Sequence, residues 1–307
     1  SVNLEPTGCA LLRSPGPLEK QDCLLLKYGP HGGGHGHPDK LGAFAFARGS
    51  DLSADLGTPG YGIELNDTWF RQTLSHNTVL VDGFSQPPAE GRLVRFESGE
   101  RAFEVADAEV EFGEPPWEGV SLRRVILWMP GYYLDFTRVR CGRERQVDLP
   151  CRMRGGAFEA RGLEPCPNPP RLQGAGYEHV DEAQRFAAPG MAELRWQQKA
   201  GSTALHLPGC GGTEIILGEV PGNPAADRSA IVIQRRQARE TAFLSVVELS
   251  CDEPLEVSHW PGGAEGFRGV VVKRGARQRA WAICEPGCEP PPLPPGSAGA
   301  EIERYRL

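Results

Sequence analysis

Three histidines and one aspartate near the amino-terminal end of the chain have the types and spacing of a metal site. His35 and His37 are separated by one residue, so on an extended strand both imidazoles point to the same face. Asp55 follows His37 after 18 residues, and His76 follows Asp55 after 21. Two imidazoles and one carboxylate suit a three-ligand Zn²⁺ site. The segment 28–86 is therefore the strongest candidate for chemistry, although a hydrogen-bonded cluster without metal remains the alternative.

Glycines surround these histidines in the stretch GPHGGGHGHPDK, and other kinds of site share such a composition. A phosphate-binding loop is excluded, because the Gly-Lys-Ser/Thr ending and a following helical pattern are missing. The oxyanion-hole loop of lipases is excluded as well, because no G-x-S-x-G pentapeptide occurs. A cupin-like metal centre matches from Gly29 to His37, but Leu41 and Gly42 stand where the cupin pattern needs a glutamate. It remains a weaker alternative.

The bulk composition excludes several classes of function. The chain has 307 residues and a formal net charge of −7, whereas a nucleic-acid-binding protein needs a basic footprint. No apolar run is long enough for a membrane span. The nine cysteines are odd in number and scattered, which predicts no disulfide framework. Cys284 and Cys288 either close a small bridged loop or stay unpaired.

Short strand-like runs dominate the sequence and predict an all-β fold, an antiparallel β-sandwich or barrel. SLRRVILWMPGYYLDFTRVR predicts a hairpin that turns at Pro130-Gly131. Helical periodicity is weak, and its best candidate is the short run Asp181–Ala188, which ends at Pro189. The predicted strands are Cys23–Tyr28, Ala43–Arg48, Asn77–Asp82, Leu93–Glu97, Ala102–Ala106, Ser121–Met129, Tyr132–Val139, Glu193–Gln197, Thr203–Leu207, Glu214–Glu219, Ala230–Arg235, Ala242–Leu249, Leu255–His259, Gly269–Lys273 and Arg279–Cys284.

Three consecutive blocks of sequence resemble the β-sheet domain of the heparinase II/III-like polysaccharide lyases. They are GPHGGGHGHPDKLGAFAFARG, DLGTPGYG and LSHNTVLVDGFSQ, and the hairpin sequence VSLRRVILWMPGYYLDFTRV that follows is similar too. The family includes heparinases II and III and the alginate and oligo-alginate lyases. The resemblance covers roughly residues 23–140 and implies a supersandwich-like β-sandwich.

The resemblance also implies roles for individual residues. His37, Asp55 and His76 resemble the family's ligands for one Zn²⁺ ion, which is mainly structural. His35 resembles its active-site histidine, and Tyr61 resembles a tyrosine near the substrate. Three further residues border the site and are candidates to grip a substrate carboxylate: Arg48, Arg71 and Asn77.

Lyases of this family cleave uronic-acid-containing polysaccharides by β-elimination, so the implied partner is an acidic polysaccharide or oligosaccharide. Full-length members also carry an amino-terminal helical (α/α) toroid, which this chain lacks. We expect residues 1–285 to form the β-sandwich domain, with a subdivision near 220 left open, and 286–307 to form a proline-rich connector and a tail or edge strand.

The missing toroid suggests that the chain is a fragment of a longer enzyme and is inactive alone. The resemblance implies a periplasmic or secreted location. A non-catalytic carbohydrate-binding or structural zinc module is the alternative.

Overall fold

The computed structural model describes residues 1–99, 103–155, 158–198, 201–209, 212–249, 253–262, 266–297 and 299–307. These residues form three β-sheets joined by loops and a few single turns of helix. Among the named strands of this part of the chain, only β20 and β21 run parallel to each other. The prediction of an all-β, antiparallel, sandwich-like fold is therefore confirmed.

The first sheet has five strands in sequence order. They are β1 (Val2–Leu4), β2 (Cys9–Arg13), β3 (Cys23–Lys27), β4 (Gly42–Ala47) and β5 (Ser50–Asp51). Single helical turns in and after this sheet are η1 (Glu5–Thr7), η2 (Leu18–Lys20), η3 (Gly33–His35), the π-helix η4 (Asn66–Phe70) and η5 (Thr73–His76). The site segment 28–86 thus leaves the first sheet after β3, returns through β4 and β5, and then enters the second sheet.

The second sheet has twelve strands and is built around two very long ones, β10 (Tyr132–Arg154) and β17 (Arg228–Glu248), which pair along most of their length. The others are β6 (Leu80–Val81), β7 (Arg92–Glu97), β8 (Glu104–Phe112), β9 (Val120–Met129), β11 (Phe158–Arg161), β12 (Glu164–Pro165), β13 (Asp181–Ala187), β14 (Ala192–Gln198), β15 (Gly201–Leu207) and β16 (Glu214–Pro221). A helical turn, η6 (Tyr177–His179), precedes β13.

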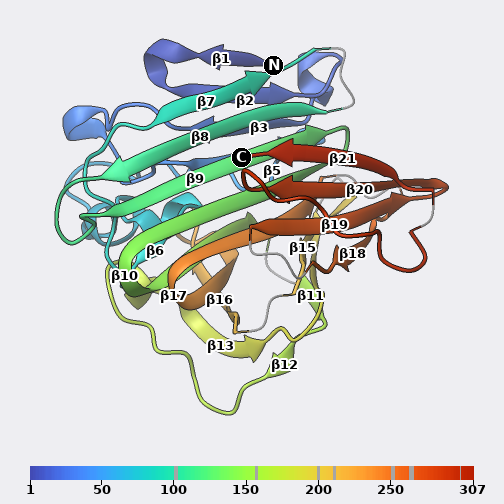
Figure 1. The fold of residues 1–307 in the computed structure, drawn as a ribbon. Helices are drawn as coiled ribbons and strands as arrows, with labels where there is room; N and C mark the ends of the chain where they lie inside the picture. The colour runs from blue at the N-terminus through green and yellow to red at the C-terminus, as the bar shows by residue number, and fades with distance from the viewer. Residues whose placement is uncertain are drawn as a thin grey trace.

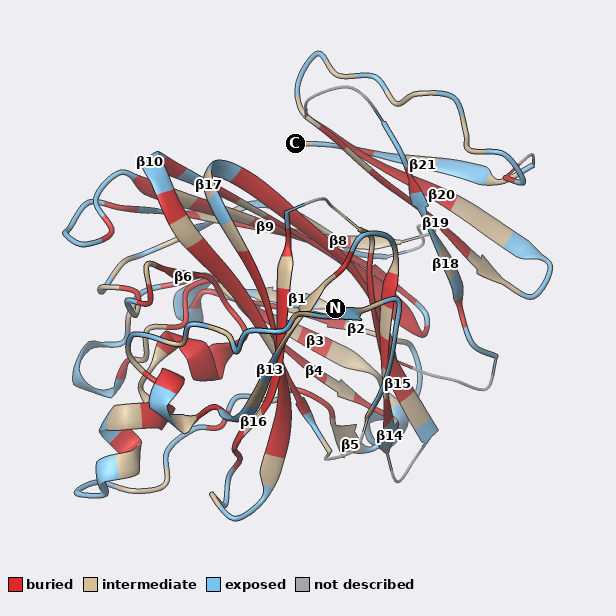
Figure 2. Ribbon diagram, turned by 90° about the horizontal axis from the view of Figure 1, so that it is seen from below, coloured by how far each residue is buried: buried red, intermediate tan, exposed pale blue. Residues whose placement is uncertain are grey.

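The third sheet contains β18 (Glu256–Trp260), β19 (Phe267–Arg274), β20 (Arg277–Cys284) and β21 (Glu301–Arg306). In Figure 1 its red strands lie in front of the green strands β8–β10, and Figure 2 shows the first and third sheets on opposite sides of the second. Alternating side chains of β9 explain this layering. Leu122 and Ile126 pack with the first sheet, whereas Val125 and Leu127 pack with the third.

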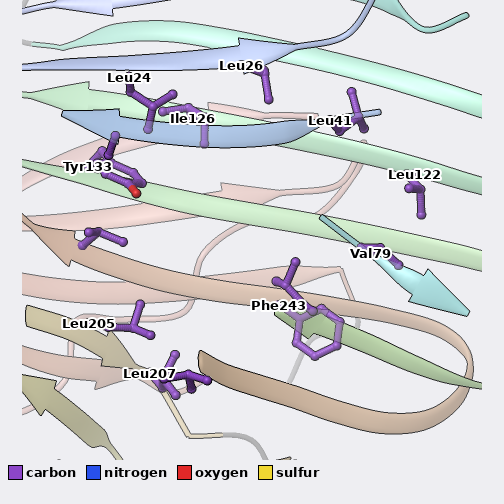
Figure 3. Packing of buried hydrophobic residues seen from close by; sticks show 14 of the residues in the cluster. Leu24, Leu26, Leu41, Val79, Leu122, Ile126, Tyr133, Leu205, Leu207 and Phe243 are labelled. Atoms are coloured by element: carbon purple, nitrogen blue, oxygen red, sulfur yellow. The ribbon is translucent and has the colours of Figure 1, made fainter. Parts of the chain in front are cut away.

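The core between the first and second sheets reaches the candidate site. Figure 3 shows Leu24 and Leu26 of β3 over Ile126 of β9, with Leu41 and Val79 in the same cluster. Leu41 follows His37 by four residues and Val79 follows His76 by three. The loops that carry these histidines are therefore anchored by buried apolar side chains.

Several local predictions can be compared with the observed strands. The hairpin at Pro130-Gly131 is confirmed, since β9 and β10 pair directly across it. The helical candidate Asp181–Ala188 is wrong, because this segment pairs as β13 with β16 and the tertiary pairing overrides a weak local preference. The predicted strand Asn77–Asp82 shrinks to β6, because Asn77 adopts a left-handed conformation with φ of 52°. Ala102 of another predicted strand lies outside the described residues.

The carboxyl-terminal segment adds a strand to the third sheet. Residues 286–297 contain no helix or strand, as expected of a proline-rich connector. After it, β21 pairs with β20, and the Tyr305 hydroxyl donates to Asp107 of β8 at 2.6 Å. Seven cysteines, Cys284 and Cys288 among them, are free in the part of the chain that the structure describes, which does not include Cys210 and Cys251.

None of the helices in the described ranges has the length and apolar character needed to cross a membrane.

A buried ion pair on the second sheet holds the loops of the candidate site. Arg124 of β9 forms a two-pronged pair with Asp135 of β10, and both side chains are at most one-tenth exposed. The remaining nitrogen of the same guanidinium, Nη1, donates to the carbonyl oxygens of Leu41 at 2.7 Å and Asn77 at 2.6 Å. Leu41 and Asn77 both have left-handed φ angles, an unfavourable conformation for leucine that surrounding contacts must maintain.

We predict that Arg124→Met lowers the free energy of unfolding by about 3–5 kcal/mol, because Asp135 would be left as an uncompensated buried charge. Urea denaturation measures this change. Arg92→Met is the matched control, since the Arg92–Glu109 pair is exposed and its loss is expected to cost less than about 1 kcal/mol. Equal effects of the two substitutions would contradict the role assigned to Arg124.

Candidate functional site

A glycine-rich turn presents His35 and His37 to different partners. Gly32 and Gly33 have positive φ angles of 86° and 62°, and residues 33–35 form the single turn η3. The expected extended strand through His35 and His37 is therefore wrong. The chain reverses so tightly that a Cβ on Gly36 would lie 1.8 Å from the carbonyl oxygen of His31. Only glycine fits there, and this close approach separates the two imidazoles.

His35 is exposed and pairs with the exposed Tyr61. The Tyr61 hydroxyl lies 2.6 Å from His35 Nδ1, and the two rings meet edge to face. The Tyr61 side chain is 74% exposed, which is unusual for an aromatic residue with only a packing role. The structure thus brings together the two residues predicted to face the substrate, on two separate loops. A phenol and an imidazole in hydrogen-bond contact form a pair that can exchange a proton.

His37, Asp55 and His76 come together beside this pair. One ligand atom of each lies within 4.8 Å of the others, and the rings of His37 and His76 are 5.0 Å apart. His76 is fully buried at the end of η5, whereas Asp55 reaches it from the loop after β5. The three predicted ligands therefore lie together, and their binding of Zn²⁺ stays a prediction. The cupin-like alternative fails, because the carboxylate comes from Asp55, whereas Leu41 is a core residue.

The hydrogen bonds of His76 fit a metal ligand. Nε2 lies 2.9 Å from the carbonyl oxygen of Phe70, and Nδ1 lies 2.9 Å from Asp55 Oδ2. Both partners are acceptors, but a neutral imidazole carries only one N–H. With Nε2–H donating to Phe70, Nδ1 is left as a lone pair that faces a carboxylate. Either a second proton on the ring or a cation shared by Nδ1 and Asp55 resolves this conflict. A backbone carbonyl on the other ring nitrogen is the usual support of a metal-bound histidine.

The electrostatics of the cluster favour the protonation states that bind metal. Burial and the neighbouring His76 lower the pKa of His37, so its imidazole is neutral at neutral pH. Burial alone raises the pKa of the Asp55 carboxyl, but a proton on His76 Nδ1 and the backbone N–H of Gly57 outweigh this effect and hold that pKa well below its usual range. A cation in place of that proton would act in the same direction. A neutral imidazole and an ionised carboxylate are the forms that coordinate a divalent ion.

The three predicted substrate-binding residues lie in different settings. Arg71 Nη2 donates to the carbonyl oxygens of Gly34 at 3.3 Å and Gly36 at 3.4 Å, on either side of His35. Arg71 therefore holds the His35 turn, and its grip on a substrate carboxylate stays a prediction. Arg48 lies on the turn after β4, where its backbone N–H donates to Asp22 Oδ1 at 3.1 Å. Its contact with substrate also stays a prediction.

The predicted substrate contact of Asn77 is wrong. Its side chain is only 3% exposed, and both ends of its amide are bonded inside the protein. Nδ2 donates to the carbonyl oxygens of Ala43 and Ser53, while Oδ1 accepts the backbone N–H of Arg152 at 2.7 Å. Asn77 therefore joins the segments of Ala43, Ser53 and Arg152 next to His76.

Two supporting arginines and one cleft escaped the sequence analysis. Arg124 and Arg152 lie far along the chain from the histidines, and no spacing pattern links them. A cleft of about 850 Å³ opens on the side of the cluster formed by Asp55. Polar and charged groups line it, including Asp51, Arg152 and Arg154.

We predict that Gly36→Ala lowers the free energy of unfolding by about 1–3 kcal/mol, because the new methyl group overlaps the His31 carbonyl. Chemical denaturation measures the change. Gly34→Ala is the control two residues away. A Cβ there meets nothing within 4 Å, so a change of no more than about 0.5 kcal/mol is expected. Equal stabilities of the two variants would contradict the close approach of Gly36 to the His31 carbonyl oxygen.

Comparisons with known proteins show which proteins this chain resembles. A family model described as heparinase II/III-like, C-terminal, matches residues 2–144. An alginate lyase of Stenotrophomonas maltophilia (strain K279a) is 29% identical over 303 residues, which cover 88% of this chain and 40% of that protein. An exo-oligoalginate lyase of Saccharophagus degradans is 33% identical over 69 residues, 19% of this chain and 9% of that protein.

Solved structures show the same fold. A heparinase III gene product superposes with a TM-score of 0.66 at 16% identity, covering 91% of this chain and 41% of its own. The heparan sulfate lyase HepC from Pedobacter heparinus gives 0.59 at 19% identity, with the same coverage. The chain thus spans about 40% of the length of the relatives that it matches over most of its own residues. The matched segment, residues 2–144, contains the whole cluster described above, and over this segment the chain is similar to the C-terminal domain of heparinase II/III-like proteins.

Proposed function

We propose that this chain supplies the β-sheet side of the active site of a polysaccharide lyase that cleaves uronic-acid-containing polysaccharide by β-elimination. The observation that carries the proposal is the contact between His35 and Tyr61, two exposed residues on separate loops beside the metal-binding cluster. Because both side chains are exposed to solvent, they are placed to contact a ligand rather than to support the fold.

The reaction requires two proton transfers. A base removes the proton on C5 of the uronate, the electron pair forms the C4–C5 double bond, and the C4–O bond to the leaving sugar breaks. An acid then protonates the leaving oxygen. Tyrosine and histidine suit these two roles, and the 2.6 Å contact lets a proton pass between Tyr61 and His35. We propose that Tyr61 takes part in proton transfer and that His35 serves as base or holds the substrate carboxylate.

We propose that His37, Asp55 and His76 hold one Zn²⁺ ion with a mainly structural role. The ion would cross-link three loops that have little regular structure of their own. His35 and Tyr61 lie on two of these loops, so a fixed cluster keeps their contact in place. The ion is assigned no part in the elimination itself.

The remainder of the active site is proposed to come from outside this chain. The relatives are more than twice as long as the segment that matches, which supports a further domain, a helical one in our interpretation. The names of the sequence relatives favour alginate-like substrates, whereas the structural neighbours are named for heparan sulfate. A periplasmic or secreted location belongs to the same proposal, because such polysaccharides are extracellular.

A zinc analysis tests the metal separately from the activity. Purified protein is expected to contain about one zinc ion per chain, as the three-ligand site implies. His37→Ala is expected to lose most of it, because a ligand is removed, whereas His35→Ala is expected to keep it. The second variant is a control of the same residue type two positions away. Unchanged zinc in His37→Ala would refute the assignment.

The catalytic proposal predicts a loss of activity by Tyr61→Phe of about 10²–10⁴-fold, the usual contribution of a positioned acid or base. The assay follows the ultraviolet absorbance of the unsaturated uronate product on alginate and heparan sulfate, using the longer polypeptide that the proposal requires. Tyr28→Phe is the matched control, because it removes a buried hydroxyl that donates to Asn3. Full activity of Tyr61→Phe would contradict the proposed role of Tyr61. Turnover by this chain alone would refute the proposal that the rest of the active site lies outside it.

A further inference from the structure

Arg152 of β10 forms hydrogen bonds to the loop that carries Asp55 and to the turn that carries His76. Its Nη2 donates to the carbonyl oxygen of Ala54, the residue before Asp55. Its backbone N–H donates to Oδ1 of Asn77, the residue after His76, at 2.7 Å. Through one residue, the longest strand of the second sheet is therefore tied to the neighbours of two ligands.

The guanidinium of Arg152 is buried without an ion pair among the described residues. It is 2% exposed, and its other contact is from Nη1 to the Ser229 hydroxyl at 3.4 Å. Buried arginines are rare unless they are paired, because a charge in the interior is costly. Arg154, two residues further on the same strand, is half exposed and pairs with Asp51 at 3.0 Å. The contrast indicates that Arg152 acts through the hydrogen-bond donors of its guanidinium rather than through a surface ion pair.

The fork suits the task of positioning. A planar guanidinium can donate in two fixed directions at once, which a lysine ammonium on a flexible stem cannot reproduce. Here the directions lead to Ala54 and Ser229, so Asp55 is held at a fixed distance from β10 and β17. Arg124 holds the other side of the cluster through the carbonyls of Leu41 and Asn77.

We propose that Arg152 is a positioning residue that sets the affinity of the His37–Asp55–His76 cluster for Zn²⁺. The inference rests on the proposed metal site and adds to it a residue that does not touch the ion. Three ligands from separate loops bind tightly only if their loops are ordered before the ion arrives, since otherwise binding must supply the ordering free energy. Arg152 orders the Asp55 loop and the His76 turn together.

The experiment compares zinc dissociation constants, measured by competition with a chromogenic chelator. Arg152→Lys keeps the charge but loses the fork, and it is expected to weaken zinc binding by about 10–100-fold, the usual effect of losing a residue that supports a ligand. Arg154→Lys is the matched control on the same strand, and its constant is expected to stay within about threefold of the wild type. Equal constants for Arg152→Lys and the wild type would overturn the proposal.

A second variant covers the case in which Arg152→Lys fails to fold. Asn77→Gly keeps the left-handed backbone conformation but removes the acceptor of the Arg152 N–H, together with the Nδ2 bonds to Ala43 and Ser53. It is expected to weaken zinc binding in the same direction by several-fold, and an unchanged constant would again count against the proposal. The visible spectrum of bound Co²⁺ serves as an independent signature, because displacement of Asp55 changes its ligand geometry.

The outcomes separate positioning from mere stability and from failure of the metal site. If Arg152 only stabilises the fold, its substitution lowers the unfolding temperature of the metal-free protein but leaves the zinc affinity of the folded fraction and the Co²⁺ spectrum unchanged. That result would overturn this inference alone. A wild-type protein that binds no zinc would overturn the metal site of the proposed function and this inference with it.

Discussion

The guanidinium of Arg124 is the contact on which the site depends. Asp135 neutralises the charge of Arg124 inside the second sheet. Both side chains are buried, so solvent water does not compete for the hydrogen bonds of the guanidinium. The pair costs desolvation free energy, so it is better explained by what it fixes than by net stability. It fixes the carbonyls of Leu41 and Asn77, and with them the ends of the two loops that carry the histidines.

This anchoring lets irregular loops behave as rigid parts. The segment from Tyr28 to Gln86 contains only short strands and single helical turns, and such segments usually carry little order of their own. Here apolar residues insert into the core, and arginines of β9 and β10 bond its backbone from behind. The long strands thus form a rigid support, and the loops on one side of it carry the residues of the candidate site.

The His37–Asp55–His76 cluster and the His35–Tyr61 pair differ in their exposure. His76 is fully buried, and both of its ring nitrogens lie within hydrogen-bond distance of partners inside the protein. His35 lies two residues from His37 but on the surface, in contact with a tyrosine that is mostly exposed. The tight approach of Gly36 to His31 creates this difference, because it turns the chain between the two histidines.

The sequence by itself determined the fold class and the partners within the site. Alternating apolar residues and turn signals predict the strands, and the ordered motif blocks identify His35, Tyr61 and the three cluster residues as one group. Local patterns failed where long-range contacts decide the conformation. Asp181–Ala187 is a strand because β16 pairs with it, and Asn77 is buried because Ala43, Ser53 and Arg152 supply its hydrogen bonds. Only the tertiary structure revealed Arg124 and Arg152, because a contact between a guanidinium and a distant backbone carbonyl leaves no periodic trace in the chain.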